Sequence, residues 1–110
     1  MTRITISTLL AGFLLSVTAI PVMAADMKAG KKKARACRTC HGIDGIARIP
    51  IAPHLAGESQ VYIETQLKAF RNGKREHEMM TVVAEGLSDE DISDLAKWYS
   101  SIEITAKMPE

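Results

Sequence analysis

Two cysteines and a histidine stand together in the run Cys37-Arg38-Thr39-Cys40-His41, which holds both cysteines of the chain. Two cysteines separated by two residues and followed at once by histidine are typical of covalent haem attachment. Thiols one helical turn apart can add to the two vinyl groups along one edge of the porphyrin. The imidazole of the next residue then lies beneath the ring and can coordinate the iron. The motif therefore predicts one covalent haem c, held by Cys37 and Cys40, with His41 as an iron ligand.

Three other uses of the two cysteines are open to this sequence. A redox-active dithiol of the thioredoxin type requires a βαβ context, which the sequence does not indicate. A structural zinc site would need His41 and His54 to complete four ligands. A plain disulfide is the third alternative. Haem is favoured because the motif agrees with the export signal and the small core described below.

A sixth iron ligand must come from elsewhere in the chain. Methionine in this position stabilises the reduced iron and raises the reduction potential, which suits an electron carrier. Methionine is also a common filler of apolar cores, so spacing alone does not choose a ligand. The candidates are His54, His77, Met79, Met80 and Met108.

The amino terminus carries an export signal. Arg3 is followed by an apolar run that extends to Ile20, Pro21 ends that run, and Ala24 offers a small residue for cleavage. This order of features indicates a secretory signal peptide over residues 1–24, and hence export to the periplasm. A retained membrane anchor is the alternative, because the uncharged stretch is almost long enough to span a bilayer. We expect cleavage, and no membrane association of the mature chain.

Length and composition limit the mature chain to one small domain. Removing 24 of the 110 residues would leave a domain at 25–110, and domains of this size usually need a disulfide, metal or cofactor to complete the core. Apolar residues make up 46% and charged residues 25%, which argues against a disordered chain. The balance of 14 Lys and Arg against 13 Asp and Glu argues against a nucleic-acid binder.

Three helical segments can be read from caps and apolar spacing. The first runs from about Asp26 to Thr39. The second starts at Glu58 or Ser59 and ends at Asn72-Gly73. The third starts at Ser88, which forms a capping box with Asp91, and should end before Pro109. Its expected buried face is Ile92, Leu95, Tyr99 and Ile102. Residues 42–57 read as loop, residues 79–84 as a short helical turn, and no strand is expected.

The segment from Lys28 to Ile102 resembles a class I cytochrome c, in the small bacterial branch that also supplies halves of dihaem cytochromes. The resemblance implies an all-α fold of three main helices and short turns, wrapped around one covalent haem. The haem motif is specific, whereas the other landmarks are individually weak. The matching landmarks are Cys37 to Gly42, Pro53-His54-Leu55-Ala56-Gly57, Tyr62 to Gly73, and Leu87 to Ile92 leading to Leu95-Ala96.

The resemblance also assigns roles to individual residues. Met80 stands seven residues before Leu87, where the branch places its axial methionine, so Met80 is expected to bind the iron. Pro53 matches the proline whose carbonyl accepts a hydrogen bond from the proximal histidine, here His41. Gly30 matches the small residue at which the first and last helices cross, near Trp98 or Tyr99.

The expected function is that of a monohaem carrier that passes single electrons between periplasmic redox partners. No nucleophile–base pair is visible, so an enzyme is not expected. The alternative is the haem subunit of a larger oxidoreductase, such as a flavocytochrome c sulfide dehydrogenase, whose partner would be a flavoprotein. A haem with an open sixth site, acting on peroxide or binding a gas, and a dithiol protein without haem are two further alternatives.

Charge is unevenly distributed along the mature chain. Residues 26–54 hold seven basic and two acidic side chains, whereas residues 55–110 hold six basic and eleven acidic ones. Such polarity can orient a redox partner and speed encounter. We therefore expect the basic half to face an acidic surface on a partner, although a solvated first helix would explain the charges equally well.

Overall fold

The structure is a computed structural model that describes residues 24–110, so the predicted signal peptide lies outside the described residues except for Ala24. All regular secondary structure in the described part is helical, as predicted. The elements are α1 (Met27–Lys33), the 3₁₀ turn η1 (Ala34–Ala36), α2 (Arg38–His41), α3 (Gln60–Arg71), α4 (Met80–Glu85) and α5 (Asp89–Ser100). Between residues 24 and 110, no helix is long and apolar enough to cross a membrane.

Side-chain caps fix the starts of the three principal helices. The Asp26 carboxylate accepts the N–H groups of Lys28 and Ala29 at the start of α1. Ser59 caps α3, and Ser88 forms the predicted capping box with Asp91 at the start of α5. Each cap satisfies backbone donors that have no partner within the helix. The sequence therefore located these three starts to within two residues.

Two helix predictions need correction. The first helix is not continuous over 26–39, because the Cys37 N–H bonds to the Ala34 carbonyl, three residues back, and this tighter turn divides the segment into α1, η1 and α2. The last helix ends at Ser100, and Ile102 lies beyond it, partly buried against the core. The spacing of apolar residues predicted that Ile102 belongs to the helix, because this spacing does not indicate the residue at which a helix ends.

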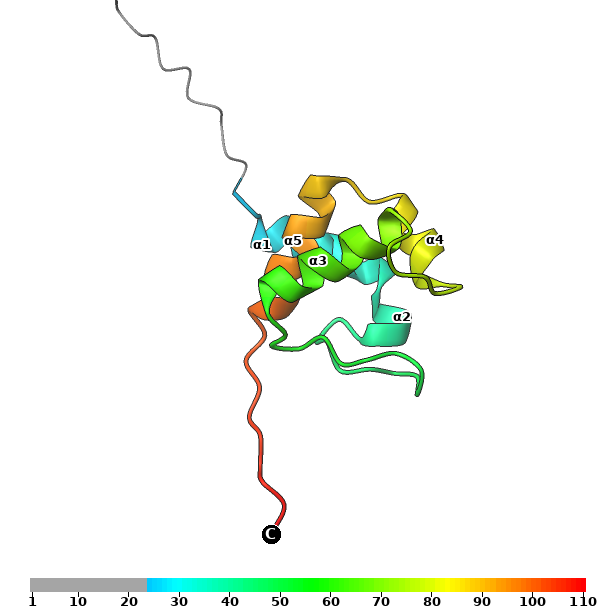
Figure 1. The fold of residues 1–110 in the computed structure, drawn as a ribbon. Coiled ribbons are helices and arrows are strands. Elements are labelled where there is room, and N and C mark those ends of the chain that lie inside the picture. Colours follow the sequence, from blue (N-terminus) through cyan, green and yellow to red (C-terminus); the bar gives the residue numbers. More distant parts are fainter. Residues whose placement is uncertain (1–23) are drawn as a thin grey trace, which may run out of the picture.

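The core lies where α1 and α3 pack against α5. Figure 1 shows α1 and α5 side by side, with α3 across them and α4 and α2 toward the other end of the molecule. A Cβ on Gly30 would lie 2.2 Å from the Asp94 carbonyl oxygen and 3.0 Å from the Trp98 Cβ, so only glycine permits this approach of α1 to α5. The predicted crossing is thereby confirmed. The buried cluster consists of Ala34, Ile63, Leu95, Ala96 and Tyr99.

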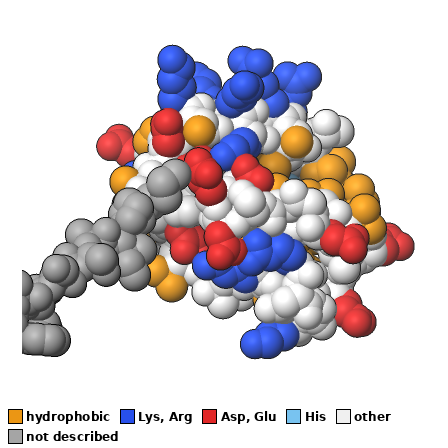
Figure 2. Space-filling model, turned by 90° about the horizontal axis from the view of Figure 1, so that it is seen from above, with side chains coloured by type: hydrophobic (Ala, Val, Ile, Leu, Met, Phe, Trp, Pro, Cys, Tyr) orange, Lys and Arg blue, Asp and Glu red, His pale blue; other side chains and the backbone are white. Residues whose placement is uncertain are grey.

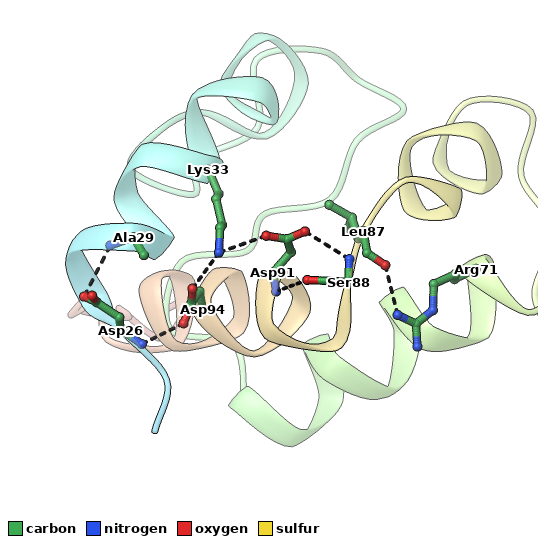
Figure 3. Close-up of polar contacts among 8 residues, drawn as sticks. All are labelled: Asp26, Ala29, Lys33, Arg71, Leu87, Ser88, Asp91 and Asp94. Atoms are coloured by element: carbon green, nitrogen blue, oxygen red, sulfur yellow. Dashed lines mark hydrogen bonds and ion pairs between the residues drawn. The ribbon is translucent and has the colours of Figure 1, made fainter. Parts of the chain in front are cut away.

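Ion pairs and hydrogen bonds reinforce this crossing (Figure 3). The Lys33 ammonium lies 2.8 Å from an Asp91 oxygen and 2.7 Å from an Asp94 oxygen. The other Asp94 oxygen accepts the Asp26 N–H at 2.7 Å, although Asp94 is only 1% exposed. Burial alone would raise the pKa of Asp94, but the Asp26 N–H and the Lys33 ammonium outweigh it and lower that pKa. The buried carboxylate is thus ionised and fully partnered.

Candidate haem-binding site

The two cysteines and His41 are brought together by the short helix α2. Cys37 is the residue before α2, and its carbonyl accepts the His41 N–H at 3.0 Å, which closes one helical turn. Both thiols are free and partly exposed, whereas His41 is 7% exposed. Burial raises the pKa of the Cys37 thiol. The structure therefore presents two thiols one turn apart beside a buried imidazole, as the motif requires.

The His41 ring is oriented by the backbone of a distant loop. Its Nδ1 lies 3.0 Å from the carbonyl oxygen of Pro53. Because a carbonyl only accepts hydrogen bonds, Nδ1 carries the proton and Nε2 keeps its lone pair. A neutral imidazole with a free Nε2 can ligate a metal, and the bond on the opposite nitrogen increases its basicity. Nε2 of His41 is thus suited to bind a haem iron from one face of the haem.

The loop between α2 and α3 is held in place by backbone hydrogen bonds. Gly45 accepts the N–H groups of Leu55 and Ala56 at 2.7 and 3.1 Å, and Arg48 donates to the Cys40 carbonyl at 2.7 Å. Gly45 has φ +72°, and a Cβ there would lie 2.4 Å from the Ala56 nitrogen. This close approach folds the loop back on itself, which brings Pro53 to His41.

The predicted sixth-ligand candidates occupy different settings. Met80 is partly buried in the first turn of α4, Met79 precedes that helix at 46% exposure, and Met108 is 86% exposed in the C-terminal segment. His77 Nδ1 accepts the N–H groups of Met79 and Met80 at 3.2 and 3.3 Å. His54 Nδ1 accepts the Ala47 N–H at 2.8 Å. Both histidines therefore use one ring nitrogen to hold local backbone.

Apolar side chains are exposed on the segments near this site. They belong to the loop after α2 and to α4 with the residue before it, and Figure 1 places these segments toward the same end of the molecule. Exposed apolar groups of this kind often mark a surface that a ligand or partner covers. The apolar face of a porphyrin is chemically compatible with such side chains. The residues, with their exposures, are Ile46 (40%), Ile51 (67%), Met79 (46%), Val82 (68%) and Val83 (46%).

Two contacts near the site were not foreseen from the sequence. The Trp98 indole N–H donates to the Ile43 carbonyl at 2.9 Å, and the Tyr99 hydroxyl donates to the Gly42 carbonyl at 3.0 Å. Buried tyrosine and tryptophan usually find a polar partner, so the need for one could have been anticipated. Which carbonyl would serve depends on tertiary packing.

The helical fold and the Cys-x-x-Cys-His site together define a class I c-type cytochrome, and the chain belongs to that family. Residues 24–98 match the family model described as cytochrome C oxidase, cbb3-type, subunit III. The chain binds haem c covalently and is an electron-transfer protein, as are the cytochromes c that it matches.

Particular relatives agree with this assignment. Cytochrome c-554(548) of Halomonas halodenitrificans is 48% identical over 83 residues, which are 73% of this chain and 100% of the relative. The crystal structure of reduced recombinant cytochrome c4 from Pseudomonas stutzeri superposes with a TM-score of 0.67 at 35% identity, covering 73% of this chain and 47% of that one. The chain thus spans about half the length of cytochrome c4.

A third relative is the cytochrome subunit of sulfide dehydrogenase from Chlorobaculum tepidum. It is 36% identical over 66 residues, which are 60% of this chain and 59% of the relative. The relatives of this chain therefore include a protein that is named simply as a cytochrome and another that is named as the cytochrome subunit of a dehydrogenase.

Proposed function

We propose that Cys37 and Cys40 would hold the haem through thioether bonds and that His41 Nε2 and the Met80 sulfur would bind its iron. The bound iron supplies the single-electron chemistry by changing between the ferric and ferrous states. The observation that carries this proposal is the His41–Pro53 hydrogen bond, which leaves Nε2 available beside two free thiols.

The protein's own groups set the conditions for electron transfer. The Pro53 carbonyl holds the His41 ring in one tautomer, so that ring does not need to reorganise when the charge of the iron changes. Methionine as the second ligand favours the reduced state and raises the potential. If His41 and Met80 both bind the iron, the protein would leave no position on the iron for an external substrate.

Optical spectra of variants test the ligand assignment. His41→Ala should eliminate the low-spin spectrum of the wild type. Met80→Ala should abolish the far-red sulfur-to-iron charge-transfer band, whereas the neighbouring Met79→Ala should retain it. Persistence of that band in Met80→Ala would contradict Met80 and direct attention to Met79 or Met108.

We further propose that residues 1–24 are removed on export and that the mature domain, residues 25–110, works in the periplasm with an acidic redox partner. Lys and Arg side chains line one edge of the face seen in Figure 2. On α1, Lys28, Lys31 and Lys32 are exposed and make no ion pair within residues 24–110, whereas Lys33 is held by Asp91 and Asp94. Lys28 and Lys32 are available to an acidic surface. The Lys31 ammonium lies 5.4 Å from the centre of the Trp98 ring and also has no carboxylate partner within residues 24–110.

Reversing two of these charges tests the partner proposal. The wild-type protein should reduce the anion ferricyanide more slowly as ionic strength rises, because salt screens the attraction. Lys31→Glu combined with Lys32→Glu should lower the rate at low salt and flatten its salt dependence. Lys74→Glu, in the acidic half of the sequence, is the matched control. An unchanged salt dependence in the double variant would contradict a role for α1.

The second candidate function is that of a permanently bound haem subunit of a dehydrogenase. The similarity to the sulfide dehydrogenase subunit favours it. Isolation of the native protein distinguishes the two functions: a free carrier elutes alone on gel filtration, whereas a subunit co-elutes stoichiometrically with a flavoprotein.

A further inference from the structure

Two adjacent aromatic residues of α5 hold the carbonyl groups of the two residues that follow His41. Tyr99 donates its hydroxyl proton to the Gly42 carbonyl at 3.0 Å, and Trp98 donates its indole proton to the Ile43 carbonyl at 2.9 Å. The partners are 57 and 55 residues apart in sequence. The last helix is therefore tied directly to the backbone next to the proposed iron ligand.

Burial makes the Tyr99 contact a strong constraint. Tyr99 is 1% exposed and lies in the core cluster with Leu95 and Ala96. Removing the hydroxyl would leave the Gly42 carbonyl with only the Gly45 N–H, which it accepts at 3.2 Å, and would end its connection to α5. Burial also raises the pKa of the Tyr99 phenol, so the hydroxyl stays protonated and remains a donor.

Gly42 has little freedom to move away from this contact. Its φ is +75°, and a Cβ there would lie 2.4 Å from both the Ile46 carbonyl oxygen and an Asp44 side-chain oxygen. Its N–H closes the end of α2 on the Arg38 carbonyl at 3.0 Å. The backbone on the carboxyl side of His41 is thus fixed by α5 as well as by its own loop.

We propose that Tyr99 is a positioning residue for the His41 imidazole, with Trp98 as a second anchor on the same segment. The Pro53 carbonyl holds the ring at Nδ1, while Tyr99 and Trp98 hold the backbone from which the ring projects. Together these contacts fix the direction of the imidazole plane. The proposal rests on the proposed role of His41 as an iron ligand.

The test uses purified holoprotein and the variant Tyr99→Phe, which keeps the buried ring and removes only the hydroxyl. In the ferric state, the proton resonances of the haem methyl groups depend on the direction of the axial imidazole plane. Tyr99→Phe should change the order or the spread of these resonances and shift the reduction potential. Tyr62→Phe is the matched control, because Tyr62 is 49% exposed and on α3, and it should leave both quantities unchanged.

Trp98→Phe keeps the test decisive if Tyr99→Phe gives little holoprotein. It removes the bond to Ile43 and should change the methyl resonances in the same manner but to a smaller extent. Variants that unfold at lower temperature yet keep the wild-type resonances and potential would overturn the inference, since Tyr99 would then serve only the core. A wild-type protein without covalent haem or a low-spin spectrum would instead contradict the proposed function.

Discussion

The α1–α5 crossing and the region of α4 differ in how fully contacts within the polypeptide bury their side chains. At the crossing, Gly30 lies against the backbone of α5, and the buried Asp94 has partners for both oxygens. At α4, Val82 and Val83 are exposed, and Met79 provides no side-chain cap for the helix. Protein contacts alone complete the first region, whereas the second leaves apolar side chains exposed. Under the proposed function, the haem would cover part of this exposed surface.

Filling the space at Gly30 should have the largest effect on stability. Gly30→Ala would place a methyl group against the Asp94 carbonyl and force α1 away from α5. Overpacking of this kind costs about 3 kcal/mol, more than the gain of about 1 kcal/mol in helix propensity. Denaturant unfolding of the holoprotein measures the loss. Gly86→Ala is the control, because its Cβ would meet nothing within 4 Å, and an equal loss there would contradict the crossing as the sensitive point.

Removing the buried carboxylate should have the next largest effect. Asp94→Ala deprives the Asp26 N–H and the Lys33 ammonium of a partner and should lower the free energy of unfolding by about 2 kcal/mol. Asp89→Ala removes an ion pair with Arg71 in which Asp89 is exposed to solvent, and should lower the free energy of unfolding clearly less than Asp94→Ala does. Equal losses in the two variants, measured by thermal unfolding, would show that the crossing does not depend on its buried charge.

Acid should weaken the crossing through Asp91. The hydrogen bond from Lys33 and the Ser88 N–H lower the pKa of Asp91 from its ordinary value of 3.8 to about 2. A depressed folded-state pKa contributes stability that is present above pH 3.8 and is lost as the pH falls toward 2. Unfolding experiments at several pH values should show wild type losing more stability than Asp91→Asn over this interval. Parallel profiles for the two proteins would be inconsistent with the assignment.

A smaller and local effect is expected at α4. His77→Ala removes the acceptor for the Met79 and Met80 N–H groups, a loss comparable to that of a helix cap, about 0.5–1 kcal/mol. Amide hydrogen exchange of residues 79–83 should become faster while α5 is unaffected. His54→Ala, which removes an acceptor for Ala47 instead, should leave exchange in α4 unchanged. Identical exchange in α4 for both variants would mean that His77 does not hold this segment.

Local signals in the sequence predicted much of the fold. Ser59 and Ser88 have side chains that satisfy helix donors a few residues away, so their roles are visible in short stretches of sequence. The division of the first helix at Cys37 and the end of α5 at Ser100 were not predicted, because both depend on backbone geometry that apolar spacing does not report. Gly30 was found through family resemblance, and the structure supplied the physical reason.

The candidate site likewise contains residues that local sequence predicts and contacts that it does not predict. Cys37, Cys40 and His41 follow from spacing alone, since one helical turn brings them together. The Pro53 contact came from the family, because no local pattern joins residues 41 and 53. The bonds from Trp98 and Tyr99 were missed because their partners are more than 50 residues away and are backbone carbonyls, which carry no residue signature.

The most direct test of the account is the intact mass of the purified protein under denaturing conditions, combined with a count of free thiols. The account predicts the mass of the polypeptide plus one haem, with neither Cys37 nor Cys40 reactive toward a thiol reagent. A mass equal to that of the polypeptide alone, or a haem that separates on denaturation and leaves two reactive thiols, would contradict it.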